Sequence, residues 1–145
     1  MVKVIEMEYS SKRLEHPLIL TGGTYQGYNY YVFSFGTHPC GYVEIPKTSK
    51  YYNVHYDNIP VSCHGGLTYS GNYLDSIATE DDGRYFIGWD YAHYNDYVGY
   101  YDMGEFQLSF TATLSKHTSM EMVNDCCEVI EQLIELENQK GGESL

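Results

Sequence analysis

Two short segments of this 145-residue chain concentrate side chains that could do chemistry. The first is CHGGLTYS over residues 63–70, in which His64 precedes the glycine pair Gly65 and Gly66. Because glycines beside a histidine remove side-chain bulk, a ligand or another strand can approach the backbone closely. The segment therefore predicts the floor of a pocket, or alternatively a bulged strand whose His64 bonds a buried partner.

The second segment is FIGWDYAHYND over residues 86–96, which leaves a predicted strand and enters a loop. Loops held by a rigid sheet commonly carry functional polar side chains. If this loop turns helically, Asp90 and His93 share a face, and the carboxylate can orient the imidazole. His93 or His64 would then act as general acid or base, whereas the alternative is that Asp90 only caps a local turn.

A divalent metal bound by Asp90, His93 and Asp96 is a further interpretation of the second segment. An isolated D-x-x-H spacing is much weaker evidence than an HExxH or a paired CxxC motif, so we predict neither a metal nor another cofactor. If the protein is an enzyme, the residues that could supply its acid–base chemistry are His64, Thr68, Asp90 and His93.

Tyrosine occurs 17 times in the chain. These rings could simply fill and rim a small core, or they could form a binding surface, because a tyrosine ring can stack on a nucleobase. Lys47, Lys50 and Arg84 are among the few cations and are candidates to meet an anionic ligand. The predicted ligand-binding residues are His64, Gly65, Gly66, Thr68, Tyr69, Trp89, Asp90, His93, Asp96, Tyr42, Lys47 and Arg84.

The charge balance excludes some partners. With 20 acidic residues against 8 Lys and Arg, the formal net charge is −12, so the chain repels nucleic-acid phosphates and binding of DNA or RNA is disfavoured. The acidity could serve solubility, or it could imitate the charge of DNA. We find no apolar run of the roughly 18 residues that a membrane span needs and no signal-peptide core, so we expect a cytoplasmic protein without a membrane partner.

The elements that position these residues follow from hydrophobic patterning. Aromatic and β-branched runs bounded by turn residues predict four strands, at 28–35, 40–46, within 59–71, and 84–91. The first two should form a hairpin, and an alternating stretch over 2–9 could add an edge strand. A turn is expected at Asp82-Gly83.

The C-terminal region carries the clearest element. The motif TSME over 118–121 matches a capping box, and the helix that it begins should run from about Ser119 to Lys140, before Gly141-Gly142. Its apolar stripe should face the sheet and its glutamates should face water. The stripe comprises Val123, Cys126, Cys127, Ile130, Leu133 and Ile134, and the glutamates are Glu128, Glu131 and Glu135.

Strands followed by a long helix predict an α+β fold, a mostly antiparallel sheet with the C-terminal helix packed on one face. The length predicts one domain over 1–145, with a weakly patterned segment over 1–20 and the helix over 118–140. The four cysteines form no CxxC pair, so neither a zinc site nor a disulfide framework is indicated, and reduced thiols are expected.

Several segments together resemble a family of small, mostly uncharacterised proteins encoded by bacteriophages and prophages. The resemblance is carried by CGYVEIP, CHGGLTYSG, FIGWDYAHYND and a capped helix ending in VIEQL, and it covers about residues 40–136. Members have a similar HGGLTYSG segment followed by a G-F-D-x-A-H segment. Here Trp89 stands where the family usually has Phe, and Tyr94-Asn95 replaces a pair of small residues.

The resemblance implies a phage protein, and such proteins often counter host defence by sequestering or cleaving nucleotide signals. The expected function is therefore sequestration, in the host cytosol, of a cyclic ADP-ribose derivative or a cyclic dinucleotide. Hydrolysis of such a signal through His64 and His93 is the first alternative, and an acidic DNA mimic or protein-interaction inhibitor is the second. The expected partner is a small nucleotide-like ligand, and the long helix could form a homodimer or a larger homo-oligomer.

Overall fold

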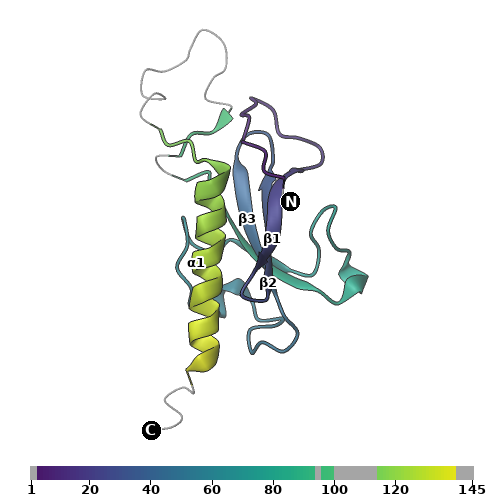
Figure 1. Cartoon of the computed structure of the whole chain (residues 1–145). Helices are drawn as coiled ribbons and strands as arrows, with labels where there is room; N and C mark the ends of the chain where they lie inside the picture. The colour runs from purple at the N-terminus through teal and green to yellow at the C-terminus, as the bar shows by residue number, and fades with distance from the viewer. Residues whose placement is uncertain (1–2, 94–95, 100–113, 140–145) are drawn as a thin grey trace.

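The computed structural model describes residues 3–93, 96–99 and 114–139. Within them, five antiparallel strands form one sheet in the order β1-β2-β3-β5-β4, and the helix α1 (Ser119–Asn138) crosses one face of it (Figure 1). The strands are β1 (Leu18–Tyr25), β2 (Tyr28–Ser34), β3 (Pro39–Ile45), β4 (Tyr69–Gly71) and β5 (Tyr85–Asp90). The predicted α+β architecture is confirmed.

The predicted strands are present with shifted limits. The hairpin of β2 and β3 is confirmed, and its register places Tyr31 opposite Tyr42. The strand expected within 59–71 shrinks to β4, because Gly65 and Gly66 have φ values of 70° and 85°, which no extended ladder can contain. The turn expected at Asp82-Gly83 is a short 3-10 helix, Glu80–Asp82, which Gly83 ends in a left-handed conformation.

The N-terminal edge of the sheet differs from the prediction. The edge strand expected over 2–9 is wrong, because residues 3–9 contain no strand, and β1 forms the edge instead. The sequence of β1, LILTGGTY, does not alternate clearly between apolar and polar residues, because two of its positions are glycines. Tyrosine rings of β2 lie against these glycines. A Cβ on Gly23 would lie 2.7 Å from the hydroxyl oxygen of Tyr30. The segment before β1 runs beside it, and the N–H of Ile5 donates to the carbonyl of Leu20 at 2.8 Å.

The two faces of the sheet carry different clusters. Along β5, Tyr85, Ile87 and Trp89 belong to the core beneath α1, whereas Phe86 belongs to a second cluster on the opposite face. This follows from the alternation of side chains in a strand. The helix-side core combines the sheet residues with the fully buried Met122, Cys126, Val129, Ile130 and Leu133 of α1.

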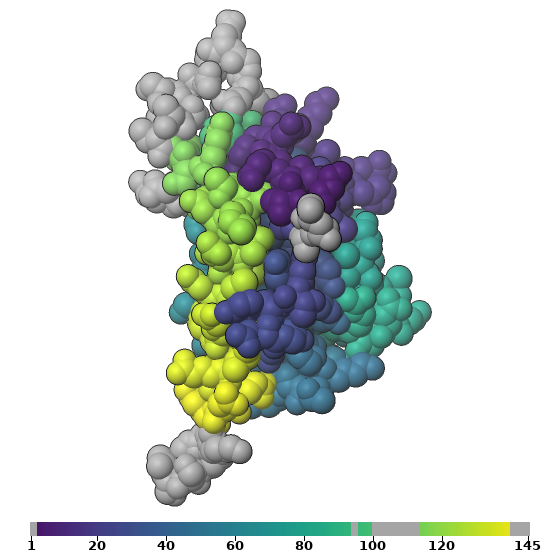
Figure 2. Space-filling model, in the orientation of Figure 1, coloured from purple at the N-terminus to yellow at the C-terminus, as the bar shows by residue number. Residues whose placement is uncertain are grey.

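The start of α1 agrees with its predicted capping box. The hydroxyl of Thr118 accepts from the N–H of Glu121 at 3.1 Å, and the Glu121 carboxylate accepts from the N–H of Thr118 at 2.8 Å. A second cap comes from the N-terminal segment, where the Glu6 carboxylate accepts from the N–H of Ser119 at 2.9 Å. Figure 2 shows this segment (purple) against the first turns of α1 (green).

The apolar stripe of α1 is rotated slightly from the predicted one. Cys126, Ile130 and Leu133 are fully buried as expected, and the three predicted glutamates are exposed. Val123, Cys127 and Ile134 are only partly buried, because the centre of the stripe is set by Met122 and Val129, which the prediction omitted. The helix ends at Asn138, and Gly141-Gly142 lies outside the described residues. No helix in the described ranges is both long and apolar enough to cross a membrane.

Replacing Ile130 by Ala should lower the free energy of unfolding by about 2 to 4 kcal/mol, because the fully buried side chain would leave a cavity beneath α1. Urea denaturation followed by circular dichroism measures this difference. Glu128→Ala, on the exposed face of the same helix, should change stability by less than about 0.5 kcal/mol. Similar small losses in both variants would mean that α1 does not pack on the sheet through Ile130.

Candidate functional site

An aromatic cluster covers the face of the sheet opposite α1. Its centre is Gly88 of β5, which pairs with Tyr42 of β3 on one side and with Tyr69 of β4 on the other. A Cβ on Gly88 would lie 2.4 Å from Cδ1 of Tyr42, so glycine is what allows the ring to lie over β5. The Tyr42 and Tyr69 rings have centroids 6.0 Å apart at 83°, and Phe33 packs on Tyr42 at 5.3 Å.

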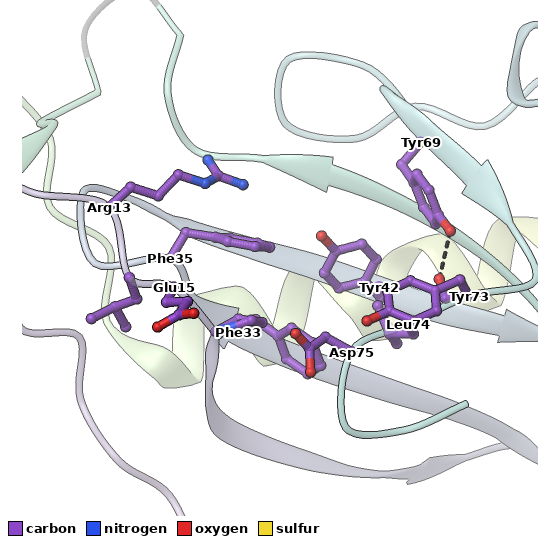
Figure 3. Close-up of a pocket in the computed structure, with 11 residues that line it drawn as sticks. Arg13, Glu15, Phe33, Phe35, Tyr42, Tyr69, Tyr73, Leu74 and Asp75 are labelled. Atoms are coloured by element: carbon purple, nitrogen blue, oxygen red, sulfur yellow. Dashed lines mark hydrogen bonds between the residues drawn. The ribbon is translucent and has the colours of Figure 1, made fainter. Parts of the chain in front are cut away.

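These rings line a cavity of about 240 Å³ (Figure 3). Its other walls come from the segment before β1 and from the loop after β4. The hydroxyl of Tyr69 donates to the carbonyl of Tyr73 at 2.5 Å, which attaches that loop to β4. The lining residues are Arg13, Leu14, Glu15, Pro17, Phe33, Phe35, Tyr42, Tyr69, Tyr73, Leu74 and Asp75. We call this space the aromatic cavity.

The charged residues of the aromatic cavity are one cation and two acids. The guanidinium carbon of Arg13 lies 4.5 Å from the centroid of the Phe35 ring, a cation–π distance that holds the charge against the wall. Glu15 and Asp75 are the acids, and Asp75 Oδ2 lies 3.3 Å from Nδ1 of the exposed His16. The cavity therefore combines stackable rings with both a cation and hydrogen-bond acceptors.

A second group of polar residues gathers beyond the end of β5. The buried carboxylate of Asp96 lies 2.7 Å from Nε2 of His64 through one oxygen and 3.0 Å from Nε2 of His117 through the other. It also accepts from the backbone N–H of His93 at 3.0 Å. Burial opposes ionisation of Asp96, but these hydrogen bonds outweigh it and hold the pKa of the carboxyl below its ordinary value. We call His64, Asp96 and His117 the histidine–aspartate cluster.

The fully buried ring of Tyr91 supports the histidine–aspartate cluster. It stacks on His64 with centroids 4.6 Å apart and planes at 24°, and its centroid lies 4.9 Å from that of His117. The Tyr91 hydroxyl donates to Asp125 of α1 at 2.6 Å and accepts from Nε1 of Trp89 at 3.1 Å. Both imidazoles are thus positioned by the junction of β5 and α1.

Asp90 and His93 form a neighbouring pair. Nε2 of His93 lies 3.1 Å from Oδ1 of Asp90, but the geometry of this contact is not that of a hydrogen bond. The same oxygen accepts from the N–H of Ala92 at 3.1 Å, which is the local turn cap considered as the alternative for Asp90. The hydroxyl of Thr68 donates to the other oxygen of Asp90 at 3.3 Å, so Thr68 is not aimed at a histidine base.

The structure therefore brings together most of the predicted catalytic residues. His64 and His93, the two histidines that the sequence offers as general acid or base, have ring centroids 6.1 Å apart. The metal set that the sequence suggested, Asp90 with His93 and Asp96, is wrong as a ligand group, because the described residues that gather around Asp96 are His64 and His117. A backbone N–H rather than its imidazole joins His93 to Asp96.

Nine of the twelve predicted ligand-binding residues lie in two places. Tyr42 and Tyr69 line the aromatic cavity, whereas His64, Gly65, Gly66, Thr68, Asp90, His93 and Asp96 lie in or beside the histidine–aspartate cluster. The other three residues lie outside both places. Trp89 is buried beneath α1 with its ring over Gly41, and Lys47 is exposed beside Gly83. Arg84 is bound by Glu44 at 2.7 Å and by the Tyr31 hydroxyl at 3.0 Å, so it is not free to hold an anion.

Sequence reasoning missed Arg13, Phe35 and His117. Arg13 lies in a segment without hydrophobic periodicity. Its contact with the Phe35 ring becomes visible only in the folded structure. His117 could have been predicted as a site residue, because it directly precedes the capping box. A residue just before a helix that packs on a sheet is held close to that sheet. What the sequence could not reveal is that Asp96 faces the start of α1.

The aromatic cavity and the Asp90–His93 pair both influence one further histidine. His38, directly before β3, is partly buried, and burial is the main cause that lowers its pKa. Asp90 raises the pKa of His38, whereas Arg13 of the cavity and His93 beside the cluster lower it. Charges at both places therefore act on the same imidazole.

Comparison with protein families, curated proteins and solved structures finds no match to this chain. The geometry of the aromatic cavity and of the histidine–aspartate cluster, together with the resemblance seen in the sequence, is therefore the basis of the function proposed below.

Gly65 and Gly66 provide a matched test of the geometry beside His64. Both have positive φ, so alanine at either costs about 1 to 2 kcal/mol in backbone strain. A Cβ on Gly65 would also lie 2.2 Å from Nε2 of His93, whereas a Cβ on Gly66 meets nothing within 4 Å. Gly65→Ala should therefore lower the melting temperature more than Gly66→Ala, and the difference should shrink when His93 is also Ala. Equal effects in both backgrounds would contradict the contact.

The ion pair of Arg84 predicts a pH effect on stability. Burial opposes ionisation of Glu44, but the hydrogen bonds from Arg84 and Asn29 outweigh it and lower the pKa of Glu44 below its ordinary value. Its stabilising contribution is therefore complete above the ordinary pKa and is lost as the pH falls through the lowered one. Denaturation midpoints of Glu44→Gln should fall less steeply than wild type in this acid range, whereas those of Glu128→Gln should follow wild type. Parallel curves for wild type and Glu44→Gln would show that the pair is not formed.

Proposed function

We propose that the protein binds a small nucleotide-derived ligand, with the base of the ligand in the aromatic cavity. The observation that carries this proposal is the arrangement of Tyr42, Tyr69 and Phe33 around one hollow with a cation on its wall. Stacking on such rings contributes about 1 to 3 kcal/mol per base, and polar groups must supply the rest of the affinity. The ring pair and the cation are the two anchors that a nucleotide needs.

The size of the cavity limits how the ligand binds. A volume of about 240 Å³ is just below the roughly 300 to 1,000 Å³ of sites that enclose a whole drug-sized molecule. A base and its ribose fit inside, and the phosphates remain near the opening. Arg13 is suited to a phosphate, and the carboxylates of Glu15 and Asp75 can accept hydrogen bonds from ribose hydroxyls.

Sequestration of a host immune signal is the function that best combines this cavity with the resemblance to phage proteins. The ligand would be a cyclic ADP-ribose derivative or a cyclic dinucleotide, captured in the cytosol of the infected cell. The net charge of −12 matters less for a small anion than the charges beside it, which at this cavity are those of Arg13, Glu15 and Asp75. The phosphate must therefore lie at Arg13 and away from the two carboxylates.

Hydrolysis of the signal is the second candidate, and the histidine–aspartate cluster is the observation that favours it. Two imidazoles on one buried carboxylate can act as general acid and general base.

Binding and hydrolysis are separated by one experiment. The protein is mixed with cyclic ADP-ribose or a cyclic dinucleotide, washed by gel filtration, denatured by heat, and the released molecules are identified by mass spectrometry. Release of the intact molecule is the expected result. Release of altered products would instead show that the protein hydrolyses the signal. If the protein retains none of the nucleotides tested, the proposal is contradicted.

Tyr69→Ala should raise the Kd of a retained nucleotide about 5- to 150-fold, as expected from losing 1 to 3 kcal/mol of stacking. Isothermal titration calorimetry measures this change. Tyr52→Ala is the control, since Tyr52 packs on Tyr85 and does not line the cavity. Loss of affinity in both variants would point to a general effect on folding.

Arg13→Gln should weaken binding of a nucleotide but leave binding of the corresponding nucleoside unchanged, because only the phosphate needs the guanidinium. Lys47→Gln is the matched control, since it removes an exposed cation that does not line the cavity. Calorimetric titration of both ligands into both variants gives the comparison. If Lys47→Gln weakens binding and Arg13→Gln does not, the phosphate lies elsewhere.

A further inference from the structure

We propose that His64, Asp96 and His117 bind a divalent transition-metal ion, with zinc as the best fit. One ligand atom from each of these residues lies within 4.8 Å of the other two. Ligands at about 2.0 to 2.2 Å from a tetrahedral zinc lie ~3.3 Å from each other. The Nε2 atoms of His64 and His117 lie 2.7 and 3.0 Å from the two different oxygens of Asp96, so an ion could enter after small side-chain movements that open these contacts and bring the widest pair closer.

The donor set determines the kind of metal. Two imidazoles and one carboxylate suit zinc and its transition-metal neighbours, whereas calcium and magnesium prefer oxygen ligands. Three protein ligands leave at least one coordination position for water or an anion, as in catalytic rather than structural zinc sites. Cys63 precedes His64 in the chain, but its thiol does not belong to this ligand group.

The charge of Asp96 gives an independent reason for a cation here. The carboxylate is 2% exposed, and its partners among the described residues are two imidazoles and a backbone N–H, with no Lys or Arg. A buried carboxylate is stabilised by such hydrogen bonds or by a positive charge. A metal ion would replace the two imidazole hydrogen bonds by a positive charge and would leave both histidines neutral, with their Nε2 lone pairs on the ion.

Surrounding groups already hold the ligands in place. The N–H of His93 orients one oxygen of Asp96. Tyr91 stacks on His64 and touches His117, while its hydroxyl is fixed by Asp125 and Trp89. Such outer contacts are typical of metal sites, where they fix the rings and tune the metal. The three ligands come from separate segments, so an ion would connect the turn at residues 63–66, the chain after β5 and the start of α1.

The test uses metal-free full-length protein, prepared with a chelator, and zinc or cobalt(II) alone as the probe. We expect one zinc ion per chain by calorimetry and a visible cobalt spectrum without a thiolate charge-transfer band. His64→Ala and His117→Ala should each weaken zinc binding at least about 100-fold, more than is usual for losing an outer partner. His55→Ala, at an exposed histidine, and Cys63→Ser should bind zinc like wild type.

The proposal is overturned if wild type binds no zinc, or if the stoichiometry survives in both His64→Ala and His117→Ala. A thiolate band that disappears in Cys63→Ser would also overturn it, because the ion would then have a different ligand set. Should an alanine variant fail to fold, His117→Gln keeps the side-chain volume but presents no imidazole, and its zinc affinity gives the same answer. None of these readouts depends on nucleotide binding.

Discussion

The alternation of side chains along β5 is the constraint on which the rest of the structure depends. One face of this strand contributes Ile87 and Trp89 to the core beneath α1, and the other face carries Phe86 and Gly88. Gly88 leaves room for tyrosines from both neighbouring strands, so the same strand that builds the core also opens the aromatic cavity. A shift of one residue in register would exchange the two faces and remove both.

At the end of β5, polar side chains are also divided between the two faces of the sheet. Tyr91 continues the helix-side face and supports the histidine–aspartate cluster, whereas Asp90 turns to the other face and meets Thr68. The carboxylate of Asp96 then joins two chain segments through His64 and His117. Two chemically different places therefore lie along β5 and just beyond its end. One is aromatic and suited to a base, and the other is rich in histidine and suited to a metal or to proton transfer.

Much of this arrangement follows from local sequence, and the remainder depends on contacts between distant segments. The capping box at Thr118 and the hairpin of β2 and β3 are confirmed, because each is specified by neighbouring residues. The edge strand β1 was missed because its glycines are explained only by rings of the next strand. Arg13 and His117 gain their surroundings from partners far along the chain, so spacing alone could not place them.

A crystal structure of the protein with the nucleotide that it retains would test the central claim most directly. Our account predicts the base in the aromatic cavity against Tyr42 and Tyr69, with a phosphate within hydrogen-bond distance of Arg13. An empty aromatic cavity, with the nucleotide bound at another surface, would contradict it.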